Sequence, residues 1–76
     1  QNFLEMGIPI NSSLQFTQGE ETCAVVNGRK VNYRNEEISL TALTKRLLNT
    51  DRPLRPAPYW LFNGRKLSDI YNDTYG

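Results

Sequence analysis

TCAVVNGRKVNYR, residues 22–34, predicts the centre of the fold, because it reads as two strands joined by a tight turn. Asn27-Gly28 is the dipeptide most typical of a two-residue type I′ turn, and strand-forming residues flank it on both sides. Apolar and polar residues alternate on the return strand, so one face would be buried and the other would meet solvent or a partner. We therefore expect a β-hairpin with strands near 22–26 and 29–34.

A further strand is expected before this hairpin. Leu14 and Phe16 alternate with polar residues over 12–17, which is the two-residue period of a half-buried strand. The polar stretch Asn35-Glu36-Glu37 after the hairpin is interpreted as a turn. The three strands would then form a small antiparallel meander.

An amphipathic helix is predicted over 40–49. Leu40, Leu43 and Leu47 recur at steps of three and four residues, which places them on one helix face. Ser39 stands directly before this stripe, where a hydroxyl side chain is a natural N-cap. The meander would pack on the apolar face of this helix.

The last third of the chain begins with a proline-rich connector, residues 52–58, which is expected to be stiff and exposed without helix or central strand. A second hairpin follows over 59–67, with Asn63-Gly64 as another type I′ signal. A short helix over 68–75 is expected to begin with Ser68 as its cap. The predicted class is α+β: an antiparallel meander on one helix, a second hairpin and a short C-terminal helix.

The amino-acid composition excludes several classes of function. The chain has 76 residues, no histidine and one cysteine, Cys23, so the usual zinc sites and the Ser-His-Asp and Cys-His catalytic arrangements are excluded. We expect no enzyme activity, no cofactor and no small-molecule substrate. No apolar run approaches the roughly 18 residues of a membrane span, and the lone cysteine favours a reducing compartment, the cytoplasm.

The first residues of the chain bear on its domain organisation. Its first residues lack the basic and apolar regions of a signal peptide, and it begins with Gln1. We therefore expect residues 1–76 to be a single small accessory domain taken from a longer protein.

The charges are distributed unevenly. The net charge is only +1, yet all nine basic residues lie between Arg29 and Lys66, where three acidic residues oppose them. This middle segment therefore has a local excess of +6, which suits contact with phosphates. A solvated surface without a partner is the alternative.

The tetrapeptide NGRK occurs twice, at 27–30 and at 63–66. Asn and Gly tolerate positive φ, and cationic residues after a turn protect edge strands from pairing with other chains. Turn chemistry alone therefore accounts for both copies, and we predict no function for the repeat.

Five motifs in order support a resemblance to a known family: GIPI at 7–10, TCAVV at 22–26, KVNY at 30–33, ISLTALT at 38–44 and YWLFNGRKL at 59–67. The chain resembles the small domain appended to bacterial GIY-YIG-type nucleases and restriction-modification proteins, a relative of the restriction-enzyme adenine-methylase-associated (RAMA) domain. The resemblance implies a DNA-binding accessory domain that is linked covalently to a nuclease or methylase domain. Sensing of base modification is the further role that this resemblance suggests.

Candidate DNA contacts follow from the resemblance and from the residues. The resemblance directs attention to Ser39 and to the segment before Trp60, while the connector combines guanidinium groups with aromatic rings suited to phosphate contact and stacking. The predicted contacts with double-stranded DNA are Ser39, Lys45, Arg52, Arg55, Tyr59, Trp60 and Arg65.

Each of three candidates also has a structural explanation. Ser39 is a helix cap, Lys45 lies near the negative end of the helix dipole, and Trp60 is a good core residue. The alternative function is a protein-interaction or spacer domain that docks on its own catalytic neighbour.

Overall fold

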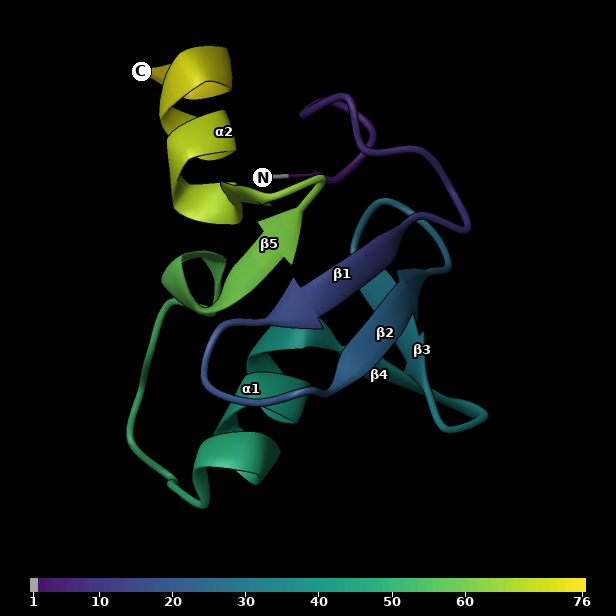
Figure 1. The fold of residues 1–76 in the computed structure, drawn as a ribbon, viewed down its shortest axis with the longest axis vertical. Helices are drawn as coiled ribbons and strands as arrows, with labels where there is room; N and C mark the ends of the chain where they lie inside the picture. Colours follow the sequence, from purple (N-terminus) through teal and green to yellow (C-terminus); the bar gives the residue numbers. More distant parts are fainter. Residues whose placement is uncertain (1) are drawn as a thin grey trace.

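Six short strands form one antiparallel sheet in the order β4-β3-β2-β1-β5-β6 (Figure 1). The computed structural model describes residues 2–76. The strands are β1 (Ser13–Phe16), β2 (Thr22–Val25), β3 (Lys30–Tyr33), β4 (Glu36–Ser39), β5 (Trp60–Phe62) and β6 (Arg65–Lys66). The α+β class and the meander of β1, β2 and β3 are confirmed.

The fourth strand corrects the sequence prediction, which interpreted residues 35–37 as a turn. The turn lies one residue earlier, at Arg34 and Asn35, whose φ angles are 51° and 66°. Two successive positive φ angles fit the tight reversal of a type I′ turn. The chain then pairs back along β3, with Ile38 opposite Val31, and both side chains are buried.

The two NGRK copies adopt different conformations. In the second copy, Asn63 and Gly64 have φ angles of 51° and 80°, which fits the predicted type I′ turn. In the first copy neither Asn27 nor Gly28 has a positive φ, so the predicted turn type is wrong there.

The first copy belongs to a four-residue loop, 26–29, that is held by other bonds. The Asn27 side-chain oxygen accepts hydrogen bonds from the backbone N–H groups of Arg29 and Lys30, at 2.9 and 3.0 Å. The Gly28 carbonyl accepts the N–H of Phe3 at 2.8 Å. The N-terminal segment therefore packs on this loop.

Gly64→Ala is expected to destabilise the protein by about 1–2 kcal/mol, because a β-carbon is strained in the left-handed region. No other atom lies within 4 Å of the position that this carbon would take, so the cost would come from the backbone alone. Urea unfolding followed by Trp60 fluorescence would measure it. Gly64→Asn is the matched control, since Asn tolerates positive φ, and an equal loss in both variants would contradict the explanation.

Helix α1 (Leu40–Leu48) forms as predicted. The Ser39 hydroxyl oxygen accepts the N–H of Ala42 at 3.1 Å, which confirms the N-cap. Asn49 closes the helix in the left-handed conformation, and its short polar side chain makes that conformation accessible.

Helix α2 (Leu67–Tyr75) begins one residue earlier than predicted. Lys66 occupies the N-cap position without a side-chain hydrogen bond, so the predicted cap at Ser68 is wrong. Leu67 is 2 % exposed, so the first residue of this helix belongs to the core. The connector also contains a short 3-10 turn, η1 (Ala57–Tyr59), where no helix was predicted.

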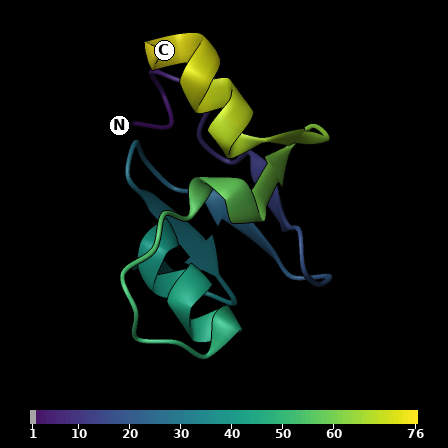
Figure 2. The same ribbon diagram turned by 90° about the vertical axis from the view of Figure 1, so that its left-hand side faces the viewer.

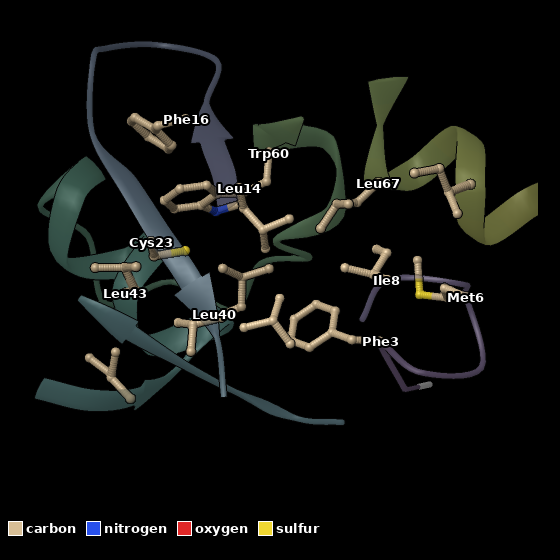
Figure 3. Close-up of a cluster of buried hydrophobic side chains, with 14 residues drawn as sticks. Phe3, Met6, Ile8, Leu14, Phe16, Cys23, Leu40, Leu43, Trp60 and Leu67 are labelled. Atoms are coloured by element: carbon tan, nitrogen blue, oxygen red, sulfur yellow. The ribbon is translucent and has the colours of Figure 1, made fainter. Parts of the chain in front are cut away.

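The core lies on one face of the sheet and is closed by both helices. β5 pairs with β1, so the second hairpin extends the same sheet. Figures 1 and 2 show α1 and α2 at opposite ends of the molecule, with β5 between them. Figure 3 shows their buried side chains meeting residues of the strands and of the N-terminal segment. Among residues 2–76 no helix has the length and apolar character needed to cross a membrane.

Candidate nucleic-acid interface

One concave feature is a cavity of about 160 Å³ that opens to solvent. Five segments meet at it: the N-terminal segment, the β2–β3 loop, the start of α1, the end of the connector and the start of α2. The residues that line it are Asn2, Phe3, Met6, Gly28, Arg29, Ser39, Leu40, Thr41, Pro56, Ala57 and Leu67. Figure 3 shows that Phe3, Leu40 and Leu67 come from three separate segments of the chain.

Backbone hydrogen bonds hold the walls of this cavity in place. The N-terminal segment is attached to the loop through the Phe3–Gly28 bond and folds on itself where the Ile8 N–H donates to the Phe3 carbonyl at 2.9 Å. At the end of the connector, the Tyr59 N–H donates to the Pro56 carbonyl at 2.9 Å. The 3-10 turn thereby orients Pro56 and Ala57 toward the cavity.

The charge at the cavity is positive. No aspartate or glutamate lines it, and Arg29 is its charged lining residue. Lys30 follows Arg29 and pairs with Ser39 between β3 and β4, while the exposed Arg55 precedes the lining residue Pro56. Among residues 2–76, these three cations form no ion pair.

The start of α1 adds to this potential. Ser39 lines the cavity and caps the helix, and the first turn of a helix carries a partial positive charge. Of the seven predicted contact residues, Ser39 is the one that lines the cavity.

Two other predicted contacts, Arg52 of the connector and Arg65 of β6, differ in their surroundings. Arg52 is exposed, and its backbone N–H donates to the Thr50 hydroxyl at 3.2 Å. Arg65 instead forms an ion pair with Asp73 of α2. That hydrogen bond and the charge of Asp73 raise the pKa of the Arg65 guanidinium, so this cation already has a partner within the domain.

Lys45 is half-buried and lies near the C-terminal end of α1, beside a shallow depression that Arg46 and Asn49 also line. Arg46 is bound by Glu36 through two hydrogen bonds of 2.8 and 3.0 Å. The hydrogen bond and charge of Arg46 lower the pKa of the Glu36 carboxyl. Lys45 does not line the cavity at the other end of the helix.

The aromatic candidates contribute to the core. Trp60 is 0 % exposed, and its indole N–H donates to the Thr44 hydroxyl at 2.8 Å. A fully buried indole has no surface with which to stack on a base, so the predicted DNA contact of Trp60 is corrected to a core role. Tyr59 is half-buried and stacks with Phe16, with ring centroids 6.4 Å apart.

Several lining residues were missed by the sequence interpretation. Arg29 was assigned to turn chemistry, although the repeat of NGRK had drawn attention to it. Asn2, Phe3 and Met6 belong to a segment for which no role was predicted. The apolar character of Phe3 and Met6 was the available signal.

Metal-binding and nucleophilic groups are sparse. Among residues 2–76 no three histidine, cysteine, aspartate or glutamate side chains are grouped so that they could hold a metal ion. Cys23 is buried, and burial raises the pKa of its thiol to about 12. The reactive thiolate is therefore scarce at neutral pH.

Comparison with known proteins finds no matching family model, no matching curated protein and no matching solved structure. The RAMA-like resemblance therefore stays a prediction that rests on the sequence motifs.

Proposed function

We propose that this chain is a non-enzymatic DNA-binding accessory module of a bacterial restriction-modification or nuclease protein. The proposal depends mainly on one observation: a cavity without carboxylates has Arg29 in its wall, and the exposed Lys30 and Arg55 are the chain neighbours of its lining residues Arg29 and Pro56. Cations without a partner in the domain are available to phosphates, and a surface of one charge attracts the opposite charge.

The proposed contact is mainly with the phosphates of double-stranded DNA. A small surface that makes about three to five phosphate contacts would give a log-log salt dependence of about −3 to −4.5. We expect an affinity in the micromolar range or weaker. A covalently linked nuclease or methylase domain in the bacterial cytoplasm would supply the chemistry.

The proposed surface differs from the one that the sequence favoured. The predicted contact Arg65 is engaged by the Asp73 carboxylate, whereas Arg29, which was not among the predicted contacts, lines the cavity. We therefore assign the main phosphate contacts to Arg29, Lys30 and Arg55, with Arg52 as a contact farther along the connector.

Replacing Arg29 and Arg55 together with Gln is expected to flatten the salt slope by about one to two units, because each lost phosphate contact removes about 0.9. Fluorescence anisotropy of a labelled duplex at several salt concentrations would measure this slope. The matched control replaces Arg46 and Arg65 with Gln, which changes the net charge equally but removes cations that are already paired.

Two results would contradict the proposal. Absence of duplex binding at low salt would exclude the DNA-binding role. An equal flattening by both double variants would mean that only the overall charge matters, and the surface assignment would be wrong.

Docking on a neighbouring domain is the second candidate function. Leu4 and Tyr75 are 50 % and 42 % exposed, and the Tyr75 hydroxyl donates to Glu5, next to Leu4. An exposed apolar pair of this kind suits a contact between domains. Absence of DNA binding at low salt would favour this function.

A further inference from the structure

We infer that the cavity takes up one unpaired base of single-ring size, so that the domain prefers DNA with an unpaired pyrimidine over fully paired duplex. This inference rests on the proposed DNA binding and names the form of DNA that the same surface would select.

The size of the cavity limits its occupant. Its volume of about 160 Å³ is close to that of an engineered apolar cavity of about 150 Å³ that binds benzene. One six-membered ring therefore fits, and the polar substituents of a pyrimidine would point to the open side. A purine has a second fused ring, which would extend beyond this space.

The walls suit the flat faces of a base. Phe3 and Met6 line the cavity and are each 8 % exposed, so the core behind holds them in place and a small part of each side chain is accessible. Aromatic and apolar side chains bind the π-face of any base, and methionine sulfur makes favourable contacts with rings. The walls therefore provide affinity without choosing a sequence.

Polar groups around the cavity suit the edge of a base. The Asn2 side-chain oxygen accepts the N–H of Leu4 at 2.8 Å, which leaves its amide nitrogen as the group that can donate to a ligand. The Ser39 oxygen accepts the N–H of Ala42, and its hydroxyl hydrogen is a further donor. These donors match the carbonyl oxygens of thymine and cytosine.

The charge of the cavity indicates why the occupant is a nucleotide rather than an apolar peptide side chain. Arg29 lines the cavity and no carboxylate opposes it, while Lys30 and Arg55 adjoin it in the chain. A base that enters the cavity brings a phosphate on each side of its sugar, and these cations would lie near both. A neutral peptide segment would leave this charge without a partner.

The test compares labelled duplexes of one sequence that differ only at a central position: fully paired, with one bulged thymine, with one bulged adenine, or with one bulged abasic nucleotide. Stacking of one base contributes between about fivefold and a hundredfold in affinity. We expect the affinity for the thymine-bulged duplex to exceed that for the paired duplex by a factor within this range. The affinity for the adenine-bulged duplex should be lower than that for the thymine-bulged one, and the affinity for the abasic bulge should equal that for the paired duplex. The abasic bulge separates base uptake from the greater flexibility of bulged DNA.

Filling the cavity would identify its role. Thr41→Leu adds bulk at a lining residue of α1, where Leu favours the helix more than Thr. It is expected to abolish the thymine preference, so that the variant binds the thymine-bulged and paired duplexes with equal affinity. Ala57→Leu fills the cavity from the connector and gives a second variant in case the first perturbs folding. Ala42→Leu is the matched control, because Ala42 is exposed and does not line this cavity.

The outcomes separate this inference from the proposed function. Equal affinity for paired and thymine-bulged duplexes would overturn the inference alone. Absence of binding to every duplex would overturn both. A thymine preference that persists in Thr41→Leu and in Ala57→Leu would exclude the cavity as the base site, and binding of an apolar peptide in place of DNA would assign it to a protein partner.

Discussion

Trp60→Ala is expected to lower the free energy of unfolding by about 3–5 kcal/mol, the usual cost of removing a large buried aromatic side chain. Trp60 is fully buried, its ring centroid lies 5.1 Å from that of Phe16, and its indole N–H is bonded to Thr44 of α1. It therefore joins the β1–β5 pair to the helix. A chain of 76 residues has a total stability of about 4–11 kcal/mol, so this variant would lose much of it.

The hydrogen bond can be measured separately from the packing. Trp60→Phe keeps a ring but leaves the Thr44 hydroxyl oxygen without the indole donor, and Thr44→Val leaves the indole N–H unpaired. Thr44→Val is expected to cost about 1–3 kcal/mol for the unpaired indole N–H, and it also removes the hydrogen bond that the Thr44 hydroxyl donates to the Leu40 carbonyl at 2.7 Å. Trp60→Phe keeps that second bond, so its cost of about 1–3 kcal/mol would come from the lost indole bond and the smaller ring. The double variant should cost less than the sum of the two, because each single change already breaks the bond.

The measurement is urea unfolding followed by far-UV circular dichroism, since Trp60 is the only tryptophan and these variants alter it. Strict additivity of Trp60→Phe and Thr44→Val would show that the bond contributes nothing to stability. A cost below about 1 kcal/mol for Trp60→Ala would contradict its core role.

Local signals predicted α1 well. The spacing of Leu40 and Leu43 marked one face, and both are buried. Ser39 marked the first turn and caps it. A helix of this kind depends on neighbours three or four residues apart, so a short stretch of sequence contains the information.

Contacts between distant segments explain the errors. The first NGRK departs from a type I′ turn where the N-terminal segment bonds to the Gly28 carbonyl through Phe3, a contact that no turn statistic contains. A two-residue turn lies instead between β3 and β4, at Arg34-Asn35. Arg is not a typical turn residue at positive φ. The strand β4 was therefore missed with its turn.

The candidate site was harder to predict than the fold. Alternation indicated that one pair among residues 59–62 is buried, but pairing of β5 with β1, with Phe16 opposite Trp60, decides which pair. The cavity joins segments near residues 2, 28, 40 and 56. Counting charges along the sequence does not distinguish Arg29, which forms no ion pair among residues 2–76, from Arg65, which pairs with Asp73.

The second large effect is expected at Leu43, the fully buried residue at the centre of the apolar face of α1. Leu43→Ala should lower the free energy of unfolding by about 2–5 kcal/mol, through lost burial and the space left behind. Leu43 belongs to the same buried cluster as Trp60, which is itself fully buried and hydrogen-bonded to Thr44. Close packing of this kind limits how far the neighbours can move to fill the space.

Leu47→Ala provides the matched control, because it removes the same atoms from the same helix at a position that is only partly buried. Urea unfolding followed by Trp60 fluorescence measures both variants, since Trp60 is retained. Leu43→Ala should be the more destabilising of the two, because Leu47 lies at the edge of the apolar face and its removal leaves space that solvent can enter. A cost below about 1 kcal/mol for Leu43→Ala, or a cost no greater than that of Leu47→Ala, would mean that the helix packs on the sheet through a different face.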